Sequence, residues 1–266
     1  MNIKILFYKL NIYMDIKKRV IPVFTYKNNV LVKSINYSNY RNVNSIIPVI
    51  KLFNKRNIDE MIFLNLNNNI DYKLLETFIN EVDYPITYGG NINNIEIMRD
   101  IYNIGFDKIS LNSILYTDED FSRKASEIFG KQSLVASIDV KKDKDKYYCY
   151  YNNSKINSNL TIEDHIENII DNNSISEVII TNTDYDGTYK GFDNNLYKNL
   201  EDYNIHILSN GGGNYDIDNI IDNANINNIY GQCFSSLFFF KKYTPNDIKK
   251  VLYNNNIGCS NYEFIF

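Results

Sequence analysis

Glycine and serine pairs follow several short apolar runs of this chain, where they could bind anions. The glycine pairs are Gly89-Gly90 and Gly211-Gly212, and the serines are Ser113 and Ser235-Ser236. Glycine lets backbone N–H groups approach an anion without a Cβ in the way, and hydroxyl groups donate to phosphate oxygens. The pattern indicates two phosphate sites and a long ligand with a phosphate at each end; the alternative is that these are only tight turns.

Three further side chains suit proton transfer or charge binding. Asp139 closes the apolar run LVASID and Asp186 lies in NTDYDGT, so each carboxylate could act as a general acid or base. A capping role in a loop is the alternative for either one. Lys33 could bind phosphate or be an ordinary solvated lysine.

These residues fall between alternating strand-like and helix-like segments. Expected strands span 20–25, 60–66, 86–89, 108–112, 134–140, 177–182, 206–210 and 228–233, and expected helices span 46–56, 72–82, 95–104, 118–129, 161–172, 194–201, 216–223 and 244–254. A polar loop is expected after the first strand and a small polar hairpin after the fifth. Eight β–α units in roughly 250 residues favour a closed α/β architecture, the (β/α)8 TIM barrel, whose active sites lie at the carboxyl ends of the strands.

The second half of the chain repeats landmarks of the first. The two glycine pairs are 122 residues apart, Asn65 and Asp186 are 121 apart, and Thr25 and Asp139 are 114 apart. Each pair occupies a similar place relative to its strand. The near-constant offset predicts two fused half-barrels related by duplication.

Composition limits the function classes. With 28 basic and 32 acidic residues the net charge is −4, so no general attraction to nucleic acid or to anionic membranes is expected. The three cysteines are widely spaced, so neither a disulfide framework nor a metal site is expected, and a reducing cytoplasm is the default location. No cofactor is expected. We interpret residues 1–14 as a disordered N-terminal extension and 15–266 as a single barrel domain.

Longer segments carry a family resemblance. They are KRVIPVF, DEMIFLNL, YGGNI, DKISLNS, FGKQSLVASIDVKK, EVIITNTDYDGTYKGFD, ILSNGGGN and SSLFFFKKYTPNDIKKVL. Together they resemble HisF, the cyclase subunit of imidazole glycerol phosphate synthase, over about residues 18–257. The stretch DYDGTYKGFD at 184–193 and the run 107–113 are specific to that family. The sister isomerase family HisA is a weaker fit, because FFFKKYTPNDIKKVL is HisF-like.

In the HisF family, ammonia made by a separate glutaminase, HisH, passes through the barrel and reacts at its mouth with a bisphosphorylated ribonucleotide. The resemblance implies one phosphate site at Gly90, Asn112 and Ser113 and the other at Gly187, Gly212, Ser235 and Ser236. It also implies that Lys33 and Asp186 bind substrate and that Asp139 is catalytic.

One catalytic position departs from the family pattern. A second catalytic aspartate should stand at the end of strand 1, where this chain has Thr25, and Asn65 replaces an acidic residue after strand 2. Threonine has no usable pKa near 7, and a general acid or base supplies roughly 10²–10⁴-fold in rate. We therefore expect poor activity as a histidine-pathway cyclase.

Four charged residues of alternating sign start strands 1, 2, 4 and 6: Arg19, Glu60, Lys108 and Glu177. The resemblance implies that they form a salt-bridged ring gating an ammonia entrance at the bottom of the barrel, and that Asp107 contacts the glutaminase. The alternative is that they are scattered charges flanking strands. A barrel that retains the gate residues but lacks one catalytic aspartate resembles the HisF paralogues of acetamidino-sugar modification, which belong to surface-glycan and flagellin-glycan pathways.

The leading hypothesis is a HisF-type synthase or lyase subunit that receives ammonia from a HisH-type glutaminase for acetamidino modification of a sugar. A phosphorylated small molecule is its expected substrate. A separate sugar amidotransferase is a further candidate partner. One alternative is a true cyclase subunit of histidine biosynthesis with altered acid–base residues. Another is a non-catalytic scaffold that activates the glutaminase and conducts ammonia onward.

Overall fold

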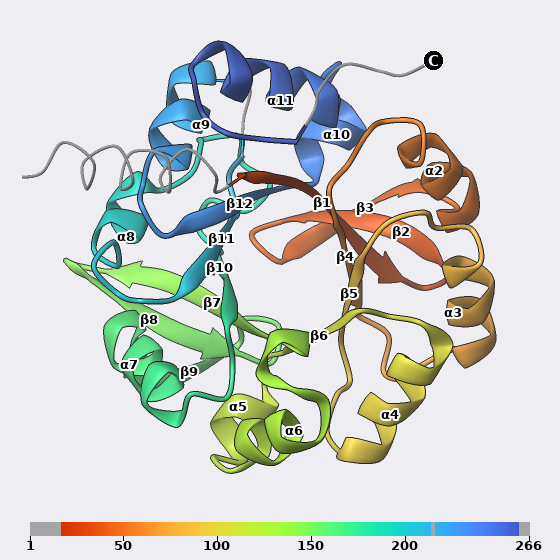
Figure 1. Ribbon diagram of the computed structural model, residues 1–266, viewed down its shortest axis with the longest axis vertical. Coiled ribbons are helices and arrows are strands. Elements are labelled where there is room, and N and C mark those ends of the chain that lie inside the picture. Colours follow the sequence, from red (N-terminus) through yellow and green to blue (C-terminus); the bar gives the residue numbers. More distant parts are fainter. Residues whose placement is uncertain (1–16, 214–215, 261–266) are drawn as a thin grey trace, which may run out of the picture.

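A closed ring of parallel strands forms the centre of the computed structural model, which describes residues 17–213 and 216–260. Within those residues the ring consists of eight strands: β1 (Arg19–Lys27), β4 (Met61–Asn65), β5 (Ile86–Gly89), β6 (Lys108–Leu111), β7 (Leu134–Asp143), β10 (Glu177–Asn182), β11 (His206–Asn210) and β12 (Ile229–Phe234). β1 pairs with both β4 and β12, and β7 pairs with β10, so the ring closes on itself. Figure 1 looks into this ring, with helices around its outside. The predicted (β/α)8 barrel is confirmed.

A helix follows each strand of the ring along the chain. These helices are α2 (Ile46–Phe53), α3 (Tyr72–Ile79), α4 (Ile95–Ile104), α6 (Phe121–Phe129), α7 (Ile162–Asn172), α8 (Asn194–Lys198), α9 (Ile217–Ala224) and α11 (Pro245–Asn254). The short helices α5 (Ile114–Thr117) and α10 (Ser236–Phe240) were not expected as separate elements. Thr161 and Thr244 begin α7 and α11 with capping boxes, and Pro245 occupies the first turn, where its missing N–H costs nothing.

Side chains alternate between two apolar layers along each strand of the ring. Val20 and Phe24 of β1 pack between strands and helices, whereas Ile21 and Val23 pack inside the ring. The same alternation directs Arg19 and Thr25 toward the barrel axis, at opposite ends of β1. Only every second residue of a strand therefore faces the barrel axis and can reach a site at either end of the barrel.

A hairpin follows β1, where a polar loop was predicted, so that prediction was wrong. β2 (Val30–Ile35) pairs antiparallel with β1 and with β3 (Ser38–Asn44). The connecting pairs Asn28-Asn29 and Asn36-Tyr37 all have positive φ, between 50° and 64°. This is the type I′ geometry that two-residue hairpin loops prefer, and asparagine tolerates it well.

A second hairpin follows β7, as predicted. β8 (Lys146–Tyr151) pairs antiparallel with β7 and with β9 (Ile156–Thr161). The first strand of each half of the barrel thus carries a hairpin at the same place. This correspondence agrees with two fused half-barrels.

The C-terminal segment packs beside the start of β1. The Lys18 backbone N–H donates to the Gly258 carbonyl over 2.7 Å, and the fully buried Lys249 ammonium lies 2.9 Å from an Asp59 carboxylate oxygen. The predicted N-terminal extension, residues 1–14, lies outside the described residues. Within the described ranges, no helix is both long and apolar enough to cross a membrane.

Candidate functional site

A cavity of about 370 Å³ opens at the carboxyl ends of β4, β5, β6 and β7. The predicted Gly90, Asn112 and Ser113 all line it, as does Asp139. Its wall is rich in side-chain amides, supplied by Asn65, Asn67, Asn68, Asn91, Asn93, Asn112, Asn152 and Asn153. Amides and hydroxyls both donate and accept hydrogen bonds, so this cavity suits a polar ligand with many oxygen atoms.

Close backbone packing fixes the wall of this cavity. Gly90 has φ +115°, and a Cβ there would lie 2.1 Å from the Asn65 carbonyl oxygen, so a larger residue would displace the backbone. The Asn152 N–H, at the tip of the β8–β9 hairpin, donates to the Ser113 hydroxyl over 3.2 Å. The second hairpin therefore contributes directly to the predicted first phosphate site.

A smaller cavity of about 20 Å³ lies on the opposite side of the ring, at the ends of β11 and β12. Its lining includes every residue predicted for the second phosphate site: Gly187, Gly212, Ser235 and Ser236. The buried hydroxyls of Ser235 and Ser236 have no hydrogen-bond partner within the described part of the chain. Buried polar atoms are normally paired, so two unpaired donors among the residues lining one cavity indicate a ligand that accepts hydrogen bonds.

Lys33 and Asp186 form a buried ion pair beside the smaller cavity. The Lys33 ammonium lies 2.7 and 2.9 Å from the two Asp186 carboxylate oxygens. Lys33 belongs to β2 and Asp186 to the loop after β10, so the pair joins the first hairpin to the far side of the barrel mouth. The alternative of an ordinary solvated lysine is excluded because Lys33 is buried, whereas a role in binding substrate stays a prediction.

Asp139 is the carboxylate of the larger cavity, and it is 4% exposed. The Tyr37 hydroxyl, at the tip of the β2–β3 hairpin, donates to its Oδ1 over 2.8 Å. Burial raises the pKa of Asp139 from its usual 3.8 to about 6, against the hydrogen bond from Tyr37, which lowers it. A carboxyl group that titrates near 6 can exchange protons at neutral pH, as a general acid or base requires.

Thr25 faces the barrel axis at the mouth, by the alternation that directs Ile21 and Val23 inward. It pairs with Val32 of β2 and Leu64 of β4, so it lies where the first hairpin leaves the ring. Thr25 does not line either of the two cavities described above. The described chain therefore presents a neutral hydroxyl at the position where the resemblance implies a second catalytic carboxylate, and that correspondence stays a prediction.

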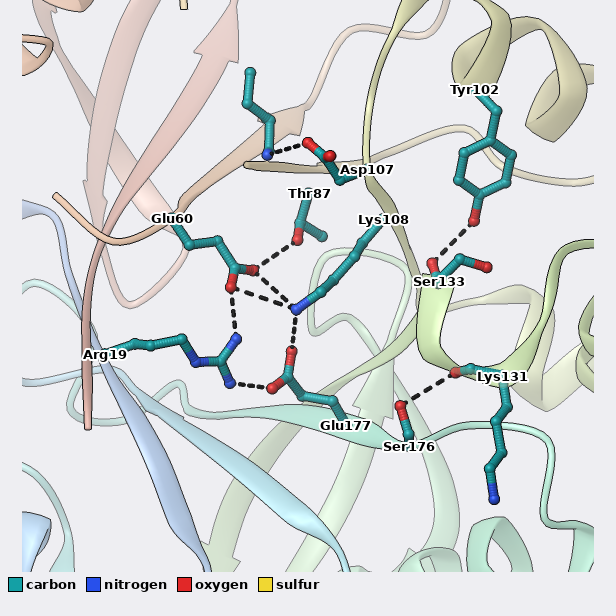
Figure 2. Close-up of polar contacts among 11 residues, drawn as sticks. Arg19, Glu60, Thr87, Tyr102, Asp107, Lys108, Lys131, Ser133, Ser176 and Glu177 are labelled. Atoms are coloured by element: carbon teal, nitrogen blue, oxygen red, sulfur yellow. Dashed lines mark hydrogen bonds and ion pairs between the residues drawn. The ribbon is translucent and has the colours of Figure 1, made fainter. Parts of the chain in front are cut away.

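Figure 2 shows the four alternating charges at the other end of the barrel, joined in a closed ring. An Arg19 nitrogen lies 2.5 Å from Glu60, and a second one contacts Glu177. The Lys108 ammonium completes the ring, 3.3 Å from Glu60 and 2.9 Å from Glu177. Burial opposes the charge of Arg19, but the two glutamates outweigh it and raise the pKa of the guanidinium.

Thr87 contacts the ring of charges, and Asp107 lies beside it at the same end of the barrel. The Thr87 hydroxyl donates to Glu60 over 3.0 Å, and the Asp107 carboxylate accepts the Ile86 backbone N–H over 2.8 Å (Figure 2). Asp107 is exposed at this end of the barrel. Its position leaves it accessible to a partner, and the partner contact itself stays a prediction.

An apolar layer separates the ring of charges from the mouth. It consists of Ile21, Val23, Ile62, Leu64, Val135, Ile179, Leu208 and Cys233, all facing the barrel axis. Such an interior excludes ions more strongly than small neutral molecules, because an unpaired charge there loses its hydration. The barrel therefore has a charged base, an apolar interior and a polar mouth.

Sequence reasoning did not find Tyr37, Thr181 or Asn210 at the mouth. The Asn210 amide donates to the Thr181 hydroxyl over 2.9 Å, and Thr181 is in turn hydrogen-bonded to Tyr37. Thr181 and Asn210 each end an apolar strand run, which was the available signal. Tyr37 lies in a segment interpreted as loop, so only recognition of the hairpin could have placed it.

Comparison with known proteins decides the family. The sequence profile of the family described as "Histidine biosynthesis protein" matches residues 19–244. A Campylobacter jejuni protein provisionally named imidazole glycerol phosphate synthase subunit hisF2 is 34% identical over 244 residues, which cover 89% of this chain and 96% of the relative. The chain belongs to the HisF family.

Two other HisF relatives are similarly matched. The imidazole glycerol phosphate synthase subunit HisF of Chlorobium limicola is 28% identical over 248 residues, covering 90% of this chain and 97% of that protein. The HisF of Staphylococcus epidermidis is 32% identical over 206 residues, covering 74% and 81%. The resemblance found in the sequence is thereby confirmed, and this HisF-type barrel belongs to a family of synthase subunits.

Proposed function

We propose that this HisF-type barrel receives ammonia from a HisH-type glutaminase at its base and uses it at its mouth, on a phosphorylated small-molecule substrate, in a pathway for acetamidino modification of a sugar. The observation that carries the proposal is the arrangement of one barrel into a charged ring, an apolar interior and a polar mouth. Ammonia is small and uncharged, so an apolar interior lets it pass more readily than ions.

The base favours a gate. Within the described residues, Arg19, Glu60, Lys108 and Glu177 pair with one another across the base, which narrows the entrance while leaving ion pairs that can be displaced. Asp107 lies on the same face, exposed. A glutaminase docked there would deliver ammonia directly to the ring.

The mouth favours a phosphorylated ligand. The paired cavities, the unpartnered Ser235 and Ser236 hydroxyls and the carboxyl group of Asp139 together offer anion binding and proton transfer. Lys33 lines the smaller cavity together with its ion-pair partner Asp186, and it could bind an anion there by exchanging that partner. A sugar amidotransferase that takes the ammonia further is an additional partner in this proposal.

A second candidate is the cyclase of histidine biosynthesis, which the names of the relatives and the retained Asp139 favour. Thr25 separates the two candidates. If the chain is not a cyclase, imidazole glycerol phosphate should form far below about 1 s⁻¹ with ammonium salts, and Thr25→Asp should raise any trace activity tenfold or more. Wild-type turnover at an ordinary enzyme rate would establish the cyclase instead.

Pairing with the glutaminase tests the leading proposal. The chain should co-purify with the HisH-type glutaminase of the same genome and raise its glutamine hydrolysis at least tenfold. Asp107→Lys should weaken the association with the glutaminase, whereas Asp145→Lys, the same change at an exposed position of the mouth end, should not. Absence of both association and activation would refute the proposal. Activation of the glutaminase without any amidated product would favour the alternative of a non-catalytic scaffold that conducts ammonia onward.

A further inference from the structure

The β2–β3 hairpin is fastened across the barrel mouth by polar contacts with the loop after β10. The Asn36 backbone N–H donates to the Asp186 carbonyl over 2.9 Å, and its side-chain amide donates to the Thr183 carbonyl over 2.8 Å. The ion pair of Lys33 and Asp186 holds the same hairpin. At Gly187 a Cβ would lie 2.3 Å from the Ser34 carbonyl, so loop and hairpin are in direct contact.

Tyr37 occupies a strained position at the tip of this hairpin. Its φ is +57°, a left-handed conformation that tyrosine adopts far less readily than the asparagine beside it. In this conformation the hydroxyl of the half-buried Tyr37 lies 2.8 Å from Asp139 Oδ1. Strain that persists at a site is a reason to look for function there.

We propose that Tyr37 is the positioning residue of Asp139, holding the carboxylate through Oδ1 so that Oδ2 is presented to the ligand while the hairpin is closed. The proposal rests on the proposed function for the reaction that Asp139 serves, although the contact itself does not. It assigns a role to a hydroxyl carried by the hairpin, on a barrel whose first strand has the neutral Thr25 near the mouth.

The chemistry of the larger cavity favours this role. Among the described residues that line it, Asp139 and Tyr37 are the two with titratable side chains. Burial and the charges of Asp139 and Asp186 raise the pKa of the Tyr37 phenol well above its usual 10, so it stays protonated at neutral pH. The phenol is therefore a fixed donor, and the proton exchanged with a ligand belongs to Asp139.

Other groups around Asp139 come from every element packed on it. Asp186, from the loop after β10, raises the pKa of Asp139, and Lys141 of β7 lowers it. Tyr116 of α5 and Cys149 of β8 are also close enough to interact, but both are held neutral by burial, which raises their pKa values. Ser154, in the β8–β9 turn, also lowers the pKa of Asp139. The hydroxyl of Tyr37 is the donor that lies 2.8 Å from Oδ1, so Tyr37→Phe removes a direct hydrogen bond from the ionised carboxylate.

Tyr37→Phe is the direct test, because it keeps the ring and removes only the donor. The Asp139 carboxyl should be titrated by carbon-13 NMR in the full chain, its signal identified by loss in Asp139→Asn. Its pKa should rise from about 6 by roughly one unit, equivalent to a tenfold weaker preference for the ionised form. Tyr40→Phe is the matched control, since Tyr40 lies on the same hairpin with its ring over Lys27.

A second measurement reads out positioning. The pH–rate profile of the product-forming reaction should be measured in the complex with the glutaminase. Its acidic limb should shift to higher pH by the same amount in Tyr37→Phe and stay unchanged in Tyr40→Phe. An unchanged Asp139 titration in Tyr37→Phe would overturn the proposal, as would a shifted titration with a wild-type pH–rate profile. If glutaminase pairing fails while the titration still shifts, the proposed function falls and the Tyr37–Asp139 contact is supported.

Discussion

Replacing Asp139 by asparagine should make the protein more stable at neutral pH. The asparagine side chain would keep the shape and an acceptor for Tyr37 while removing a buried charge. The pKa of Asp139 is raised from 3.8 to about 6, and one unit corresponds to about 1.4 kcal/mol. Ionised Asp139 therefore costs the folded state about 3 kcal/mol at pH 8, where it is charged in both folded and unfolded chains.

The gain should depend on pH in a defined direction. Because the folded-state pKa is the higher one, the carboxyl group contributes stability below about pH 4, and this contribution is lost as the pH rises through about 6. The free energy of unfolding of Asp139→Asn should thus exceed that of wild type by about 3 kcal/mol at pH 8 and by only about 1.5 kcal/mol at pH 5. For a chain of this size the difference at pH 8 corresponds to a Tm increase of about 6 °C or more.

Urea unfolding and thermal scans at both pH values measure the effect. Asp145→Asn, an exposed carboxylate in the β7–β8 turn, is the matched control and should change stability little at either pH. A gain for Asp139→Asn that is equal at pH 5 and pH 8 would refute the argument, because it would come from packing and not from charge. A loss of stability at pH 8 would refute it outright.

Three further changes test other parts of the barrel. Glu177→Gln should cost about 2 kcal/mol at pH 7 in urea unfolding, and since the pKa of Glu177 is lowered by its cationic partners despite burial, the loss should fade as the pH drops below about 4. Gly212→Ala should abolish phosphate binding measured by calorimetry, because its Cβ would lie 2.2 Å from the Gly191 carbonyl at φ +87°. Lys249→Met should lower thermal stability by about 3 kcal/mol, since it leaves Asp59 without its cation.

The barrel could be predicted from the sequence because its signals are local and repeated. Apolar strands alternate with amphipathic helices along the whole chain, and Gly105 marks the end of α4 as Thr244 marks the start of α11. The first hairpin was missed because its turns contain no Asn-Gly or Asp-Gly pair. Asn28-Asn29 between YK and VLV was the usable signal, since asparagine also tolerates the positive φ of a type I′ turn.

The sequence could predict which residues line the candidate site, but not which of them pair with one another. Gly90, Asn112 and Ser113 were grouped from their places at strand ends, and they do line one cavity. The pairing of Lys33 with Asp186, 153 residues apart in the chain, depends on how the missed hairpin folds over the mouth. No local pattern carries that information, because it arises only when the ring closes.

The two ends of the barrel differ in how fully their polar groups are paired, and that difference has a functional meaning. At the base, Glu60 and Glu177 each bind both cations of the ring, so this end is complete as it stands and changes only if a partner displaces an ion pair. At the mouth, Ser235 and Ser236 are buried without partners among the described residues, and Asp139 titrates far above its usual range. Unpaired donors and a destabilised charge reduce the stability of the empty barrel, and a ligand at the mouth would recover it. We therefore expect phosphorylated ligands to raise the Tm by binding at the mouth. A glutaminase bound at the base should instead act by rearranging ion pairs that are already formed.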